Sequence, residues 1–167
     1  MFLGASAPIA CAAAQTRIPS YSGAGLHLID SFEGLAQPIE KDRFEGSGPV
    51  DARSYGRGAY MAPIEHARKA LARFPGVAFH KGWIPALFEE PPASAWSFGD
   101  LDVAHHAPTH AALEYFHPRL APGGVIICDD YGSPTFPGAQ RAWHAYCEKH
   151  GVPFVVLDTG QAVILKA

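Results

Sequence analysis

Segments with the pattern of β-strands alternate with segments with the pattern of α-helices along most of this chain. The apolar, strand-like segments lie at 26–29, 77–79, 97–103 and 125–128, and the helix-like segments at 5–15, 63–73, 109–116 and 138–150. The last of these strands is continuously apolar, as expected of a central strand buried on both faces. This alternation predicts an α/β fold, in which a Rossmann-like, mostly parallel sheet carries helices on both faces.

Two features complete the expected architecture. The segments 153–157 and 161–166 are separated only by Asp158-Thr159-Gly160, which predicts a hairpin and therefore an antiparallel last strand. The segment 34–62 is rich in Gly and Pro and lacks periodicity, and loops of that length often cover a binding site. A length of 167 residues suits one domain, so we expect a single domain over 1–167.

Charge and composition exclude several classes of protein. The formal charge is −3 and there is no basic run, so we expect no nucleic-acid partner. The sequence has no apolar run of membrane-spanning length, so we expect no membrane partner. The odd number of cysteines, without a CxxC pair, favours reduced core thiols and a cytoplasmic location. Formation of a homo-oligomer stays open.

Aspartates stand at the ends of several predicted strands. Asp30 follows the strand 26–29, Asp102 lies at the end of 97–103, and Asp129 and Asp130 follow the run 125–128. In open α/β sheets, ligands bind beyond the carboxyl ends of the strands, where these carboxylates would meet. A hard divalent cation such as Mg²⁺ would relieve the repulsion among Asp102, Asp129 and Asp130. The alternative is that each aspartate only forms a turn or caps a helix.

Two further groups of residues could take part in binding or chemistry. The small residues from Gly4 to Ser6 open the first predicted helix, whose backbone N–H groups could face an anionic ligand, and Asp30 could bind ribose hydroxyls. The adjacent His105 and His106 follow the strand 97–103 and could act as a general base or a metal ligand. The alternative for this pair is a solvated loop.

Several motifs together resemble the macrocin O-methyltransferase family of S-adenosylmethionine-dependent enzymes. The resemblance covers 28–167, and its motifs are Asp30-Ser31-Phe32-Glu33-Gly34-Leu35, His80-Lys81-Gly82-Trp83-Ile84-Pro85, Pro118-Arg119-Leu120 with Pro122-Gly123-Gly124, Asp129-Asp130-Tyr131-Gly132, Pro137-Gly138-Ala139 and Thr159-Gly160-Gln161-Ala162. The resemblance implies a metal-dependent methyl transfer from S-adenosylmethionine to a hydroxyl of a sugar or related small natural product. It implies a cofactor site at Asp30, Ser31 and Phe32, with Mg²⁺ at Asp102, Asp129 and Asp130.

The sequence departs from the family pattern at two places. The family's fourth strand continues as Asp-x-Asp-x-Tyr-x-Pro-Thr, and without a gap Ala104 stands at the second Asp, the expected base, and His106 at the Tyr. We therefore expect His105 or His106 to replace the base, although a register that uses Asp100 and Asp102 stays open. The family's first strand and Gly-rich loop would precede Gly4, so we expect the domain to be truncated at its N-terminus, with that strand missing.

The sequence leaves three functions open. The first is a metal-dependent O-methyltransferase with a small-molecule hydroxyl acceptor. The second is a degenerate, non-catalytic relative that binds a nucleotide-like ligand or a partner, which Ala104 favours. The third is a metal-dependent hydrolase on a similar sheet, for which the sequence offers no distinctive nucleophile or zinc-ligand spacing.

Overall fold

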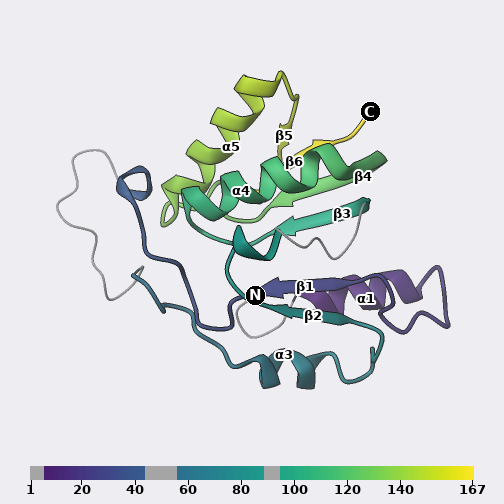
Figure 1. Ribbon diagram of the computed structural model, residues 1–167. Coiled ribbons are helices and arrows are strands. Elements are labelled where there is room, and N and C mark those ends of the chain that lie inside the picture. Colours follow the sequence, from purple (N-terminus) through teal and green to yellow (C-terminus); the bar gives the residue numbers. More distant parts are fainter. Residues whose placement is uncertain (1–5, 44–55, 89–94) are drawn as a thin grey trace.

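The computed structural model describes residues 6–43, 56–88 and 95–167. These residues form a mixed α/β fold with parallel strands and helices on both sides of them, as the alternating pattern predicts (Figure 1). The elements are α1 Ser6–Gln15, β1 His27–Asp30, η1 Glu40–Asp42, α3 Ile64–Ala70, β2 Ala78–Lys81, η2 Ala86–Phe88, β3 Trp96–Leu101, α4 His106–Phe116, η3 His117–Arg119, β4 Leu120–Cys128, α5 Pro137–His150, β5 Val155–Val156 and β6 Ala162–Leu165.

The described strands form two separate hydrogen-bonded sheets. One contains β1 and β2 in parallel, and the other has the order β3-β4-β6-β5. β3 pairs with β4 in parallel, with Leu101 opposite Cys128, whereas β6 is antiparallel to both of its neighbours, β4 and β5. The predicted antiparallel last strand is therefore confirmed. In Figure 1, β1 and β3 run in the same direction, so their carboxyl ends point to the same side.

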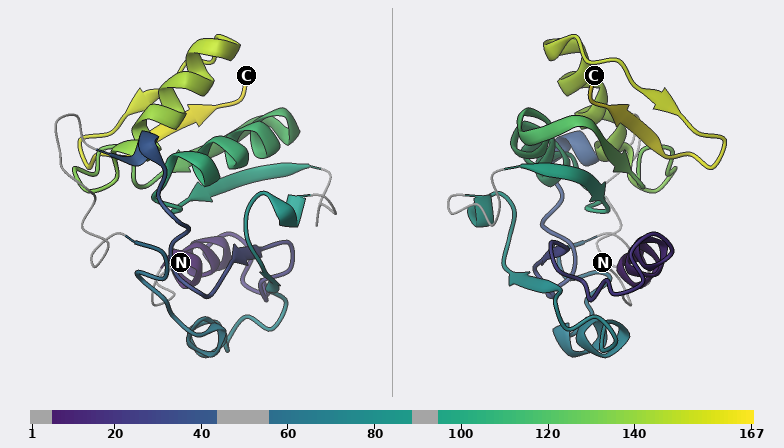
Figure 2. Two further views of the ribbon diagram at one scale, coloured as in Figure 1. Left: turned by 60° about the vertical axis from the view of Figure 1, so that its left-hand side comes forward. Right: turned by 90° about the vertical axis from the view of Figure 1, so that its right-hand side faces the viewer.

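Each sheet has its own hydrophobic core. Residues of α1, β1 and α3 make one cluster, which contains Cys11, Leu28 and Leu71. Residues of α4, α5 and the four-stranded sheet make the other, in which Trp143 and Ile126 are completely buried. α1 and α4 lie on opposite sides of the strands in the right-hand view of Figure 2. The interior of the described residues is thus divided into two apolar centres.

Several predicted boundaries differ from the structure. α4 begins at His106, three residues before the predicted start at 109. Thr109 instead lies inside the first turn, and its hydroxyl donates a hydrogen bond to the carbonyl of His105 at 2.7 Å. β3 ends at Leu101 and not at 103, and β4 begins at Leu120, before the Gly123-Gly124 pair.

A buried aspartate from the long loop caps α4. Asp42 Oδ1 accepts a hydrogen bond from the His106 N–H at 2.6 Å, and Oδ2 accepts one from the Ile39 N–H at 2.8 Å. Arg141 of α5 holds the same loop by donating hydrogen bonds to the carbonyls of Lys41 and Arg43. Since the start of α4 would otherwise leave N–H groups unsatisfied, Asp42 fixes both the helix and the loop.

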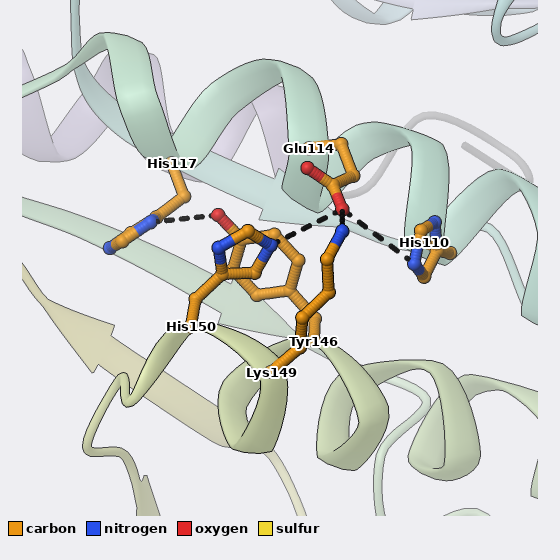
Figure 3. Close-up of polar contacts among 6 residues, drawn as sticks. All are labelled: His110, Glu114, His117, Tyr146, Lys149 and His150. Carbon is orange, nitrogen blue, oxygen red and sulfur yellow. Dashed lines mark hydrogen bonds and ion pairs between the residues drawn. The ribbon is translucent and has the colours of Figure 1, made fainter.

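Polar side chains join α4 to α5 at the other ends of these helices. Figure 3 shows Glu114 facing Lys149 and His150 of α5, with Lys149 Nζ at 2.8 Å and His150 Nε2 at 3.3 Å from Oε1. Behind them, the buried Tyr146 hydroxyl lies 2.9 Å from His117 Nδ1. The histidines outside the adjacent pair therefore include members with a packing role between helices.

Two observations bear on compartment. All three cysteines are free thiols and are buried, as the sequence predicts. None of the helices in the described parts of the chain is long and apolar enough to cross a membrane.

Gly138 at the start of α5 has no room for a side chain. A Cβ there would overlap Asp42 Oδ1 and would lie 2.8 Å from the His106 nitrogen. We expect Gly138→Ala to displace the Asp42 cap and to lower the free energy of unfolding by about 2 kcal/mol or more. Gly99→Ala is the matched control, because its Cβ would meet Ile126 at an ordinary 3.6 Å. Urea unfolding measures both variants, and equal stability of the two would contradict the role given to Asp42.

Candidate active site

A cavity of about 1300 Å³ separates the two sheets. Consecutive residues of β1 (27–30) and of β3 (96–101) line it, so the cavity meets both strands along their edges rather than along one face. Within the described residues, β1 pairs only with β2, and β3 pairs only with β4. The expected N-terminal truncation and Gly4 lie outside the described residues.

The cavity brings together most of the residues singled out from the sequence. Its wall includes Ser6 from the first turn of α1, Asp30 and Ser31 after β1, Asp102 after β3, and Asp129 and Asp130 after β4. Phe32 is buried behind this wall and is not part of the lining. Because the parallel strands end on one side, carboxylates from both sheets converge there.

The turn after β1 is held by its own side chains. Asp30 Oδ1 accepts a hydrogen bond from the Phe32 N–H at 2.6 Å, and Phe32 has the left-handed φ of 55°. The Ser31 hydroxyl donates to the Gly34 carbonyl at 3.0 Å and accepts from the Glu33 N–H at 3.1 Å. These bonds fix the direction of the Asp30 carboxylate before any ligand binds.

Asp130 joins the ends of β3 and β4. Its Oδ2 accepts a hydrogen bond from the Ala104 N–H at 2.7 Å, and the Val103 N–H also bonds to this carboxylate. Ala104 adopts the left-handed φ of 60° that most residues avoid. Burial, together with the nearby Asp102 charge, raises the pKa of Asp130 to about 6. Asp130 thus acts as a buried tie between two strand ends.

Asp100 and Asp102 face the cavity between protein walls. Burial raises the pKa of Asp100 to about 6, and the charges of Asp129 and Asp102 add to the shift, while a hydrogen bond from Ser6 opposes it. Burial also raises the pKa of Asp102, with Asp129 and Asp30 contributing. Both side chains are open to solvent through the cavity, yet like charges and protein surround them. The cluster therefore favours any ligand that brings a proton or a positive charge.

The donor chemistry suits a hard cation, but the described residues do not form a finished metal site. None of the described Lys or Arg side chains forms an ion pair with Asp100, Asp102, Asp129 or Asp130. The described parts of the chain contain no group of three His, Cys, Asp or Glu side chains arranged to hold a metal ion. Asp130 is taken up by backbone N–H groups, and Asp129 Oδ1 lies 3.1 Å from Gln161 Nε2.

The two adjacent histidines are not among the residues that line the cavity. His105 occupies the N-cap position of α4 without a capping side-chain hydrogen bond and is buried, and its ring centroid lies 6.2 Å from that of Phe136. His106 is buried beside Asp42 and stacks on His110, and burial lowers the pKa of His106. The structure therefore places Ala104, rather than either imidazole, on the cavity wall at this point of the chain.

Sequence reasoning missed four residues of this region. Asp42 carries no local signal, because the helix that it caps is 64 residues away. Phe136 and Gln161 line the cavity from the segments after β4 and before β6. His27 also lines it, and its Nδ1 lies 2.9 Å from His80 Nε2 on β2. Gln161 could have been found, because it stands within the Thr-Gly-Gln-Ala motif.

The raised carboxyl pKa gives a dependence of stability on pH. Since the folded-state pKa of Asp100 is about 6 and its ordinary value is 3.8, ionisation of Asp100 destabilises the folded state as the pH rises from about 4 to about 6. We expect Asp100→Asn to raise the melting temperature at about pH 7 and to leave it nearly unchanged at about pH 4.

Histidines with a lowered pKa, such as His106, make the folded state more stable as the pH rises toward about 6.5, and this opposes the effect of Asp100. The contribution of Asp100 is therefore measured as the difference between the variant and the unsubstituted chain. Asp158→Asn, at an exposed residue of the turn between β5 and β6, is the control. Differential scanning fluorimetry across this pH range measures all three proteins. A melting temperature for Asp100→Asn that follows the unsubstituted chain at every pH would contradict the crowding of carboxylates.

Comparison with known proteins identifies the family of this chain. The family described as macrocin-O-methyltransferase (TylF) matches residues 12–163. The chain is 32% identical over 140 residues to the mycinamicin III 3''-O-methyltransferase of Micromonospora griseorubida, which covers 78% of this chain and 52% of the relative. It is 30% identical over 129 residues to the 8-demethyl-8-(2,3-dimethoxy-alpha-L-rhamnosyl)-tetracenomycin-C 4'-O-methyltransferase of Streptomyces olivaceus, which covers 75% of this chain and 48% of the relative.

Solved structures show the same fold. The O-methyltransferase NovP superposes with a TM-score of 0.80 at 18% identity, over 100% of this chain and 69% of that one. The calicheamicin methyltransferase CalS11 has a TM-score of 0.78 at 20% identity, over 98% of this chain and 68% of that one. The chain spans about half the length of the curated relatives that it matches. The extent of the family match and the identity to these relatives show that the chain belongs to the macrocin O-methyltransferase family.

Proposed function

We propose that this chain carries the cofactor and acceptor cavity of an S-adenosylmethionine-dependent O-methyltransferase. The acceptor in this proposal is a hydroxyl of a sugar or a related small natural product. One observation carries it: Asp30 after β1 and the carboxylates after β3 and β4 line one cavity, although they belong to separate sheets. Family membership supplies the class of reaction, and the names of both curated relatives describe O-methyltransferases of sugar-bearing natural products.

The cofactor half of the cavity lies between α1 and the turn after β1. Ser6 begins α1 and forms a side-chain hydrogen bond with Asp100, and Asp30 and Ser31 line the same cavity. The Asp30 carboxylate, held by the Phe32 N–H, is suited to accept hydrogen bonds from ribose hydroxyls. S-Adenosylmethionine supplies an activated methyl group when bound. The chain's contribution is to fix the direction of that group relative to the acceptor.

The acceptor half lies beside β3 and β4. Asp100 is suited to take the proton of the acceptor hydroxyl, because it lines the cavity and burial raises its pKa to about 6. Removal of that proton makes the oxygen a better nucleophile for the methyl carbon. The sequence-based proposal that His105 or His106 removes the proton stands as the alternative to be tested against it.

A hard divalent cation, Mg²⁺ above all, is a further part of the proposal. Asp102 and Asp129 follow neighbouring strands, and both carboxylates face the cavity. Mg²⁺ commonly binds through one or two carboxylates and keeps several waters, so two aspartates suffice to hold it. Such an ion would lower the pKa of a hydroxyl that it binds. The free, buried cysteines are compatible with the cytoplasmic location proposed from the sequence.

The second candidate is a non-catalytic relative that binds the same cofactor or a similar nucleotide. Ala104 favours it, because this residue lies on the cavity wall without a side chain that could move a proton. The two candidates differ in methyl transfer and not in cofactor binding, so both can be tested on the same protein.

Cofactor binding gives the first test. We expect S-adenosylhomocysteine to raise the melting temperature on the order of 5 °C at saturating concentration, because it binds only the folded state. Asp30→Asn should remove most of this shift, whereas Asp158→Asn should keep it. The absence of a shift in the unsubstituted chain would contradict the proposed function.

The same assay tests the cation. With MgCl2 we expect a further rise that EDTA reverses and that the double variant Asp102→Asn, Asp129→Asn no longer shows. The same melting temperature for the unsubstituted chain in MgCl2 and in EDTA would remove the cation from the proposal and leave the cofactor site in place.

The identity of the base gives a separate test. We expect Asp100→Asn to lower methyl transfer from S-adenosylmethionine to a rhamnoside acceptor by roughly 100-fold or more, a usual loss for a general base. His105→Gln and His106→Gln should change the rate only slightly, since neither lines the cavity. A large loss in a histidine variant that still binds S-adenosylhomocysteine would return the role of base to that histidine.

A further inference from the structure

Two aromatic rings from distant parts of the chain meet on the cavity wall. Tyr60 precedes α3 and Phe136 precedes α5, and both line the cavity. Their ring centroids are 6.2 Å apart at an interplanar angle of 69°, so the edge of one ring meets the face of the other. Tyr60 is 46% exposed. A wide aromatic surface is therefore presented to the cavity.

The backbone holds Tyr60 in place from the side of the Asp30 turn. The Leu35 N–H donates to the Ala59 carbonyl at 2.8 Å, and the Gly58 N–H donates to the Leu35 carbonyl at 3.0 Å. Gly34 permits this close approach, because a Cβ there would lie 2.5 Å from the carbonyl oxygens of Gly58 and Ala59. The segment with Tyr60 is thus fixed to the turn that follows β1.

Tyr60 itself has the left-handed φ of 60°. For a bulky residue this backbone conformation costs about 1 kcal/mol or more and persists only where the surroundings enforce it. In a loop without a binding role, a glycine could adopt this φ at a lower energetic cost than tyrosine. The strain therefore indicates that the position of this ring matters.

Polar groups that line the same cavity indicate the kind of ligand. Asp129, with Gln161 bonded to it at 3.1 Å, follows β4 on the same cavity wall and can accept and donate hydrogen bonds. A pyranose ring has C–H groups on its faces and hydroxyls around its rim. A cavity lined by aromatic rings and by carboxylate and amide groups offers contacts for both parts of such a ring.

We propose that Tyr60, supported by Phe136, forms the wall against which a pyranose ring of the acceptor packs, with the ring hydroxyls directed to Asp129 and Gln161. This inference rests on the proposed function and deepens it, because it assigns the sugar to one part of the cavity. Tyr60 acts here as a binding residue for the acceptor, and it takes no part in cofactor binding.

Saturation-transfer difference NMR with methyl α-L-rhamnopyranoside tests this assignment, with the acyclic polyol mannitol as the control ligand. We expect the unsubstituted chain to give signals from the ring C–H protons of the rhamnoside and none from mannitol. Tyr60→Ala should weaken rhamnoside binding roughly five- to tenfold, the usual range for loss of one aromatic contact. Tyr60→Phe and Met61→Ala, the latter at an exposed neighbour outside the cavity lining, should bind as the unsubstituted chain does.

The thermal shift with S-adenosylhomocysteine is measured on the same variants and reports folding and cofactor binding together. An unchanged cofactor shift in Tyr60→Ala, with weakened rhamnoside binding, supports the inference. Equal rhamnoside binding in Tyr60→Ala overturns it, as does an equal loss of rhamnoside and cofactor, which would make the ring part of the cofactor site. If the unsubstituted chain does not bind the cofactor, the proposed function fails, whereas a rhamnoside signal that depends on Tyr60 would still support the aromatic wall.

Discussion

The separation of β1 from β3 is the constraint on which the rest of the structure depends. The two strands run in the same direction, and within the described residues neither pairs with the other (Figure 1). The cavity lies along their edges, and each sheet therefore packs its own apolar core. Because both strands end on the same side, the carboxylates that follow them share one solvent-filled space. Residues that are far apart in the sequence lie close together because the parallel strands end on the same side.

That proximity has an electrostatic consequence. Asp100, Asp102 and Asp130 are surrounded by protein and by one another, and each has a raised pKa. A chain selected only for stability would place a lysine or arginine among them, since unpaired like charges disfavour the folded state. The repulsion among these carboxylates lowers the stability of the folded state, but it also provides carboxyl groups that can take a proton near neutral pH. Clusters of this kind are typical of binding and catalytic sites.

The sequence predicts the elements and the strand-end carboxylates well, because both depend on short-range patterns. Apolar runs that end in Asp30 and Asp129 locate β1 and β4, and the parallel order then brings these residues to one wall. The start of α4 could not be predicted, because Asp42 provides its cap from a distant loop and the local signal pointed to Thr109. The direction in which His105 and His106 face depends on that same start, since a helix that begins at His106 turns both rings away from the cavity. Tyr60 falls within the predicted loop 34–62, and its partner Phe136 is 76 residues further along the chain.

The central claim is that the cavity between β1 and β3 is the cofactor site. A crystal structure of the chain with S-adenosylhomocysteine tests it most directly. The account predicts the cofactor inside the cavity, with its ribose hydroxyls within hydrogen-bonding distance of Asp30 and its sulfur directed toward Asp100 and Asp102. A cofactor bound elsewhere on the chain, or a cavity that stays empty at saturating concentration, would contradict it.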